Sequence, residues 1–324
     1  MKKLLVWLML LSCTGCSALP AEERAFAVAL MVTKKGESWQ VYGRIPTYQS
    51  DGSYRTVTGE GTQLLSALAD MEAASPMPLH LSQLRLLVLD AALEGDAISV
   101  LQTVSERADM RLQCSVAMTE IPANVLMEAL VPQTGTRLSK MLDVLLESRQ
   151  EQGLVLPMTL ADAIRMGERQ TPVLMALTLQ NDALDVSGGY ALGMQNVPLT
   201  AQETVLLSLL WGTAKTPYLL LQDGGARVRD VHCRITLEGS SAATVEVTMQ
   251  AVENSMPTDL LEAALAEELL ALLTRLSQSG CDVLGLGQQA MCGVDTMNDW
   301  YALAWPERLK GIRWTVTVRV TGIT

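Results

Sequence analysis

Residues 84–89 read LRLLVL, so five of the six side chains are apolar. A strand with one face in water alternates apolar and polar residues, whereas a nearly continuous apolar run is typical of a strand covered on both faces. Such strands lie inside sheets that have helices packed against them. We therefore expect this segment to be an inner strand of a layered fold.

The chain before this strand predicts a β-hairpin followed by a helix. Apolar residues alternate over residues 26–32 and again over residues 39–45, and the turn-forming Lys34-Lys35-Gly36 lies between them. Residues 49–61 contain Gly and Ser and read as a loop. Apolar residues at helical spacing over residues 64–71 predict the first helix.

The chain after this strand predicts further helices and strands. We expect a helix over residues 98–104 and a half-buried, alternating strand over residues 112–118. Residues 138–146 show the spacing of an amphipathic helix, for which Thr136 is the predicted cap. A short helix is expected over residues 160–166.

The second half begins with two apolar strands, over residues 173–179 and 184–192, joined by the turn-forming Gln180-Asn181-Asp182. Thr200 and Glu203 have the spacing of a capping box ahead of an apolar helix.

Two alternating strands are expected next, over residues 231–237 and 245–249. A long helix follows, with Asp259 and Glu262 as its predicted cap and Gly280 at its end. The alternation over residues 312–320 predicts a final strand.

Strands and helices interleave without a strict strand–helix–strand rhythm. This order predicts an α+β fold of two to three modules, each a mixed or antiparallel sheet flanked by helices. We expect a lipoprotein signal peptide at residues 1–15, an N-terminal module or modules at residues 16–170, and a C-terminal module or modules at residues 171–324.

The first residues have the composition of a secretion signal. Lys2 and Lys3 precede eight apolar residues, which are too few to span about 30 Å of hydrocarbon. Cys16 follows the small residues Thr14 and Gly15, an arrangement that favours acylation of this thiol and cleavage before it. Cys13 is the alternative. Lipidation at Cys16, or at Cys13, would attach the mature chain to a bilayer through its acyl chains.

The charge of the chain argues against a nucleic-acid partner. The formal net charge is −11, and it becomes −13 when Lys2 and Lys3 are removed, leaving 22 basic and 35 acidic residues. Phosphate backbones and anionic headgroups repel such a protein. We therefore expect attachment through acyl chains or through a protein partner.

The sequence offers no catalytic or metal-binding motif. It contains no GxSxG, P-loop or HExxH pattern, and its two histidines, His80 and His232, have no carboxylate or cysteine at metal-ligand spacing. Residues 285–290 match a loose GxGxxA pattern, but without the strands of a dinucleotide fold they predict a turn into a short helix. We expect no catalytic residue, no metal and no cofactor.

The remaining cysteines lack the close pairing of a zinc site. Cys114 and Cys233 fall on the apolar side of alternating strands, which favours buried thiols. Cys281 and Cys292 could pair in an oxidising compartment, and the sequence leaves this open.

Several segments, in order along the chain, resemble the C-subunit lipoproteins of spore nutrient-germinant receptors. After the signal, Gly59-Glu60-Gly61-Thr62 is similar to a Gly-x-Thr segment and residues 79–89 to an apolar central strand of that family. Residues 189–192 and 198–204 resemble its Gly-x-Ala-Val-Phe…Leu…Glu-Thr stretch, although Gly193-Met194 replaces its Phe.

Asp282-Val283-Leu284-Gly285-Leu286-Gly287 resembles the family's Asp-Ile-Leu-Gly-Phe-Gly motif. Trp300, Trp305 and the closing strand follow it in the family's order. Two departures are Ser17-Ala18-Leu19 in place of Trp-Asp-Arg and Gln83 in place of a histidine.

The resemblance implies three α/β modules without catalytic residues, in which the Gly-, Asp- and Trp-bearing motifs serve the architecture. It implies a role in spore germination beside the membrane A and B subunits of a germinant receptor, with the lipid anchor on the extracytoplasmic face of the inner spore membrane. An extracytoplasmic solute-binding lipoprotein of a transporter is the alternative function.

Overall fold

The computed structural model describes residues 23–47, 53–131, 137–167, 169–222 and 224–322. Its largest feature is an eight-stranded sheet in the order β10-β9-β8-β7-β6-β2-β3-β4. The inner strands β2 (Ala29–Lys35), β6 (Leu86–Asp90), β7 (Ser115–Thr119) and β8 (Val173–Gln180) run parallel. Antiparallel strands extend both sides, namely β3 (Ser38–Pro46), β4 (Tyr54–Gly61), β9 (Ala183–Leu192) and β10 (Asn196–Thr200).

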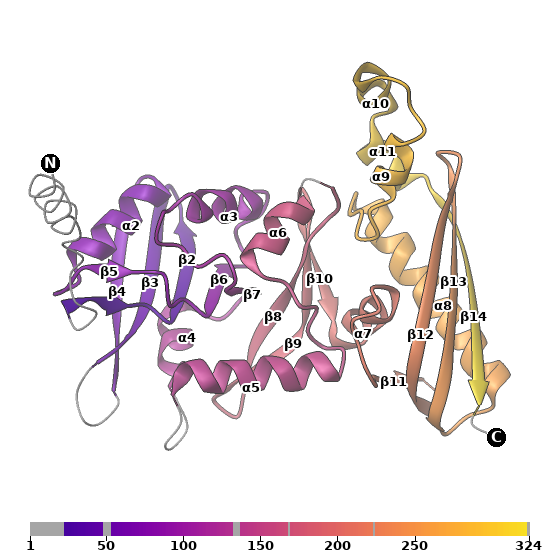
Figure 1. The fold of residues 1–324 in the computed structure, drawn as a ribbon, viewed down its shortest axis with the longest axis horizontal. Coiled ribbons are helices and arrows are strands. Elements are labelled where there is room, and N and C mark those ends of the chain that lie inside the picture. The colour runs from indigo at the N-terminus through magenta and orange to yellow at the C-terminus, as the bar shows by residue number, and fades with distance from the viewer. Residues whose placement is uncertain (1–22, 48–52, 132–136, 168, 223, 323–324) are drawn as a thin grey trace, which may run out of the picture.

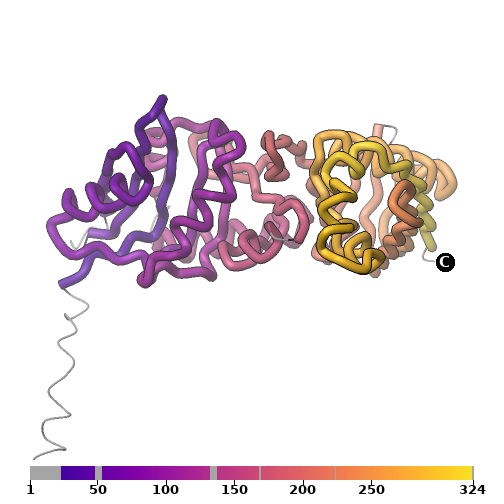
Figure 2. The backbone as a smooth tube through the Cα atoms, turned by 90° about the horizontal axis from the view of Figure 1, so that it is seen from above, coloured from indigo at the N-terminus to yellow at the C-terminus, as the bar shows by residue number. Residues whose placement is uncertain are grey.

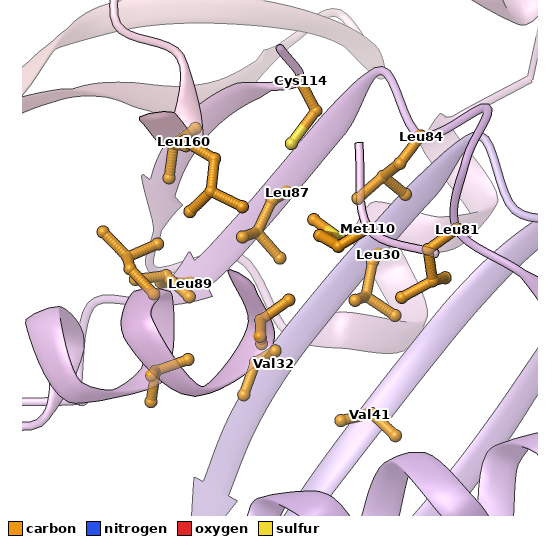
Figure 3. Close-up of a cluster of buried hydrophobic side chains, with 14 of the residues drawn as sticks. Leu30, Val32, Val41, Leu81, Leu84, Leu87, Leu89, Met110, Cys114 and Leu160 are labelled. Carbon is orange, nitrogen blue, oxygen red and sulfur yellow. The ribbon is translucent and has the colours of Figure 1, made fainter. Parts of the chain in front are cut away.

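Helices cover both faces of this sheet (Figure 1). One face carries α2 (Leu64–Ala73), α3 (Ala97–Ser105) and α6 (Leu160–Gly167), and the other carries α4 (Ala123–Ala129) and α5 (Leu138–Glu151). Each face has its own hydrophobic core. Figure 3 shows Leu87 and Leu89 of β6 in the core beneath α2, α3 and α6. Leu86 and Val88 of the same strand belong to the core beneath α4 and α5. The prediction of an inner strand covered on both faces is therefore confirmed.

The second sheet has four strands, β11 (Tyr218–Leu221), β12 (Gly224–Glu238), β13 (Ala242–Asn254) and β14 (Arg313–Gly322), in that order. The long helix α8 (Thr258–Gln278) packs across one face of it. Three short helices, α9 (Leu286–Met291), α10 (Met297–Leu303) and α11 (Trp305–Lys310), lie at one end (Figure 1). Two short strands, β1 (Ala25–Phe26) and β5 (Leu79–His80), form a separate parallel pair.

The two sheets lie end to end in an elongated molecule (Figure 2). Helix α7 (Ala201–Leu210) lies between them, and its apolar residues share one core with strands of both sheets. The predicted division between residues 170 and 171 falls just before β8, which pairs with β7. One sheet therefore contains strands from both predicted parts, and the division itself stays a prediction.

The α+β class and most of the predicted elements agree with the structure. The hairpin of β2 and β3 turns at Gly36, and the turn between β8 and β9 places Asn181 and Asp182 in the left-handed region. Thr200 accepts a hydrogen bond from the Glu203 amide at 3.2 Å, while the Glu203 carboxylate accepts one from the Thr200 amide at 2.9 Å. The capping box is thus formed as predicted.

Three predictions about elements were wrong. The loop prediction over residues 49–61 missed β4, which pairs with β3 and packs against α2. The strand expected from residue 112 begins at Ser115, and it is buried on both faces rather than one. Asp259 lies in the first turn of α8, and the residue at the cap position is Pro257. Thr136 lies outside the described residues.

The histidines and cysteines have ordinary surroundings. His232 is exposed on β12, and the His80 ring lies 5.9 Å from that of Phe26, centroid to centroid. Cys114, Cys233, Cys281 and Cys292 are all free thiols. Within the described part of the chain, no helix combines the length and the apolar character needed to cross a bilayer.

Candidate functional site at the junction of the two sheets

The candidate site is built on the chain that leaves α8. Gly280 ends this helix in the left-handed conformation, with φ of 75°. The Gly280 amide donates to Ser277 O and the Cys281 amide to Leu276 O, both at 2.9 Å. This is the hydrogen-bond pattern of a Schellman motif, and it turns the chain sharply so that Asp282 points into the interior.

The Asp282 carboxylate accepts three hydrogen bonds. Its donors are the amides of Leu286 and Gly287, at 2.9 and 2.7 Å, and the indole Nε1 of Trp305, at 3.0 Å. Asp282 is only 9% exposed, so these donors replace the water that an ionised carboxylate needs. The side chain thereby fixes the start of α9 and joins it to α11.

The two glycines of the motif are required for different reasons. Gly285 has a φ of 68°, which favours glycine. A Cβ on Gly287 would lie 2.8 Å from Trp305 Nε1 and 3.1 Å from Asp282 Oδ2, where a side chain cannot fit. The positive φ explains the glycine at position 285. The close approach of the α9 backbone to the Asp282 carboxylate and the Trp305 indole explains the glycine at position 287.

The same segment binds the rest of the molecule through its main chain. The Thr171 amide, just before β8, donates to Asp282 O at 2.8 Å. Trp211, just after α7, donates through Nε1 to Val283 O at 3.1 Å. Neither Thr171 nor Trp211 was singled out from the sequence, because their partners lie far away along the chain.

Cys281 is packed into this junction as well. A Cβ on Gly193, in the turn between β9 and β10, would lie 2.9 Å from the Cys281 sulfur. Burial raises the pKa of the Cys281 thiol to about 11, which keeps it protonated and unreactive at neutral pH. Cys281 therefore serves as a packing group here.

A cavity of about 770 Å³ lies beside Asp282, between the two sheets. On one side it is lined by α3, by the end of α6 and by the chain that leads into β8; on the other it is lined by α9, α10 and α11. The side chains that define its character are Arg169, Gln170, Gln288, Met291, Trp300 and Trp305.

The lining of this cavity combines aromatic, apolar and polar side chains. Among the described residues its charged lining side chains are Arg169 and Asp282, and the Asp282 oxygens are already occupied by three donors. The exposed Cys292 thiol has no histidine beside it in the lining. Nowhere in the described residues do three His, Cys, Asp or Glu side chains gather as a metal site would require.

The structure places the sequence-predicted residues in different regions. It brings together Asp282, Gly287, Trp300 and Trp305 around one cavity, with Gly285 at the start of α9 beside them. Thr200 and Glu203 lie apart from it, at the start of α7. Cys16 and the alternative Cys13, the predicted lipidation positions, lie outside the described residues.

Known proteins give two matches to this chain. A family model described as "Spore germination protein N-terminal domain" matches residues 18–179, which is 162 of 324 residues. Among curated proteins, none matches the sequence. Among solved structures, the crystal structure of the GerBC protein has the same fold, with a TM-score of 0.55 at 13% identity, over 91% of this chain and 97% of that one.

The family match covers most of the eight-stranded sheet with the helices that pack on it, and the structural match extends through both sheets and the junction between them. The chain therefore belongs to the family of spore germination proteins that this N-terminal domain defines.

Proposed function

We propose that the protein is a non-catalytic, lipid-anchored subunit of a nutrient germinant receptor, which supports spore germination together with membrane A and B subunits. Membership of the spore germination family is the observation that carries this proposal. The junction supports it, because the buried Asp282 carboxylate is used there to hold the fold together.

The proposed anchor is a diacylglycerol on Cys16, with Cys13 as the alternative. It would hold the acidic modules in a thin layer on the extracytoplasmic face of the inner spore membrane. Tethering of this kind raises the effective concentration of a subunit near its membrane partners to roughly the millimolar range. A weak protein–protein interface could then maintain the complex.

The test of the anchor uses a fatty-acid probe and two variants. Labelling is expected in the wild type and in Cys13→Ala, and it should be lost in Cys16→Ala. Labelling that persists in Cys16→Ala and disappears in Cys13→Ala would move the anchor to Cys13.

The test of the receptor role compares wild-type spores with spores that carry the Cys13/Cys16 double-alanine form. The unanchored form is expected to fold, to recover less of both membrane subunits on co-purification, and to reduce nutrient-triggered germination. Germination that is unaffected by deletion of the gene, with uptake of a solute abolished, would establish the transporter alternative instead. That alternative predicts two similar lobes, whereas the two sheets here have eight and four strands.

A further inference from the structure

We propose that the cavity at the junction binds a small planar apolar molecule that carries a carboxylate. This inference concerns the protein's own ligand chemistry and does not depend on the receptor role. It rests on an aromatic wall, on a set of polar side chains without partners, and on the size and position of the cavity.

The aromatic wall consists of Trp300 and Trp305. Their rings are stacked with centroids 6.3 Å apart and an angle of 26° between the planes. Trp305 is fixed from behind, because its Nε1 donates to Asp282. Trp300 is half-buried and is one of the lining residues, with the apolar Met291 and Leu309 near it in the same lining. A stacked indole pair of this kind, held in place at Trp305, favours a flat, apolar ligand.

The polar side chains come mainly from the opposite side of the cavity. Arg169 and Gln170 precede β8, and Gln288 lies on α9. Within the described residues these three side chains have no hydrogen-bond or ion-pair partner. Arg169 and Gln288 are exposed and Gln170 is half-buried, so each is open to a ligand. A guanidinium and two amides that line one cavity offer enough donors to hold both oxygens of a carboxylate.

The local charge selects the sign of the ligand. Among the described residues, the charged side chains of the lining are those of Arg169 and Asp282, and Asp282 accepts three hydrogen bonds from the protein itself. Asp282 keeps its negative charge, but its oxygens are occupied, so Arg169 is the charged side chain of the described lining that is free to pair with a ligand. This holds although the chain as a whole is acidic, because the interaction with Arg169 acts at contact distance while distant surface charges are screened.

The volume of about 770 Å³ lies within the usual range of roughly 300–1,000 Å³ for small-molecule sites. Sites of this kind form preferentially where two parts of a protein meet. A bound molecule would contact Arg169, just before β8 of the eight-stranded sheet, and Trp300, on α10 at the end of the four-stranded sheet. It would thereby link the two halves.

The experiment uses 1-naphthylacetate as the probe and 2-(1-naphthyl)ethylamine as its cationic counterpart. The full-length protein is held in nanodiscs of zwitterionic lipid, and the rate of Cys292 alkylation is followed by mass spectrometry, because this exposed thiol lines the cavity. A ligand with about 14 non-hydrogen atoms is expected to bind with a Kd of about 1 mM. At about 5 mM, the carboxylate should slow alkylation about sixfold and the amine should have little effect.

Two matched pairs of variants locate the binding site. Arg169→Gln should abolish the preference for the carboxylate, whereas Arg165→Gln, on the neighbouring exposed turn of α6, should keep it. Trp300→Ala should weaken binding at least tenfold, whereas Tyr301→Ala, which removes an exposed ring next to it on α10, should not.

Melting curves of all four variants show whether each is folded. Should Trp300→Ala unfold, Arg169→Gln carries the test, because Arg169 is exposed. The proposal is overturned if neither probe slows alkylation, if both slow it equally, or if Arg169→Gln retains the preference. Each of these results would leave co-purification with membrane subunits, the test of the receptor role, unaffected.

Discussion

The packing of the junction depends on the absence of a side chain at Gly287. A methyl group there would press against Trp305 Nε1, at 2.8 Å, and against Cδ1, at 3.0 Å. We expect Gly287→Ala to separate the indole from Asp282 and to lower the free energy of unfolding by about 2–3 kcal/mol. Urea titrations followed by tryptophan fluorescence measure this loss.

Gly311→Ala is the matched control. Gly311 has an ordinary φ of −98°, and the nearest atom to an added Cβ is Arg308 O at 3.6 Å. A change of less than about 0.5 kcal/mol is expected for this variant. Equal losses in Gly287→Ala and Gly311→Ala would show that the Asp282–Trp305 contact has no special importance.

Cys114 predicts a dependence of stability on alkaline pH. It lies in the core shown in Figure 3, where burial raises its pKa from 9.0 to about 12. Between these values the unfolded chain releases the thiol proton and the folded chain keeps it, so stability falls as the pH rises. The wild type should therefore lose roughly 2 kcal/mol through this group between pH 7.5 and 10.5.

Cys114→Ala removes the titrating thiol. It should be less stable than the wild type at pH 7.5, because alanine fills less of the core, yet it should lose about 2 kcal/mol less on going to pH 10.5. Urea titrations at the two pH values give the comparison. Tyr190, whose pKa burial raises to about 12, contributes equally in both proteins. Identical pH profiles would contradict the role of the Cys114 thiol.

Among the helices, α7 and α10 begin with the same capping arrangement but differ in burial. Thr200 accepts from the Glu203 amide, and Thr296 accepts from the Asp299 amide, each at 3.2 Å. From Thr204 to Leu210 every residue of α7 is buried, whereas α10 has no buried residue. Loss of the α7 cap should therefore lower the free energy of global unfolding, whereas loss of the α10 cap should affect only local opening of that helix.

We expect Thr200→Ala to lower the free energy of global unfolding by about 1 kcal/mol. Thr296→Ala should leave global unfolding nearly unchanged and should speed amide exchange in α10 alone, because this helix can open locally. Hydrogen exchange and urea titration on both variants make the comparison. Global destabilisation by Thr296→Ala would mean that α10 contributes more to the fold than its exposure indicates.

The elements that could be predicted from sequence are those with local causes. The turn at Asn181 and Asp182 and the Thr200–Glu203 capping box depend on residues a few positions apart. Strand β4 was missed because its extended backbone depends on pairing with β3. At Gly59, a Cβ would lie 2.2 Å from Ala67 O, so the glycine serves the approach of α2 rather than a loop.

The candidate site shows the same limit. The segment from Asp282 to Gly287 could be identified as a turn into a short helix, since the glycines and the aspartate are close in sequence. Its bonds to Thr171 and Trp211 could not, because they span 111 and 72 positions (282 − 171 and 283 − 211). Long-range contacts of this kind depend on the assembly of both sheets, and no local pattern marks them.

At the scale of the whole molecule, α7 is the element that connects the two sheets. The hydrophobic core around α7 contains Val173 and Ala191 from the eight-stranded sheet together with Val228 and Val245 from the four-stranded sheet. Leu207 of α7 is fully buried in this core. The stability of each sheet should therefore depend on the other through this helix.

This coupling can be tested by comparing two leucines of equal burial. Leu207 lies in the shared core and Leu101, on α3, lies in a core made by the large sheet and its helices, and both have 0% exposure. Each substitution by alanine should lower the free energy of unfolding by about 2–5 kcal/mol, because it removes buried methyl groups and leaves a cavity.

Leu207→Ala should speed amide exchange in both β8 and β12. Leu101→Ala should leave β12 protected, because α7 and the junction separate the cavity at position 101 from the small sheet. Exchange that rises in only one of the two sheets of Leu207→Ala would mean that the halves unfold independently, and that the hydrogen bonds at Asp282 and Val283 join two separately stable units.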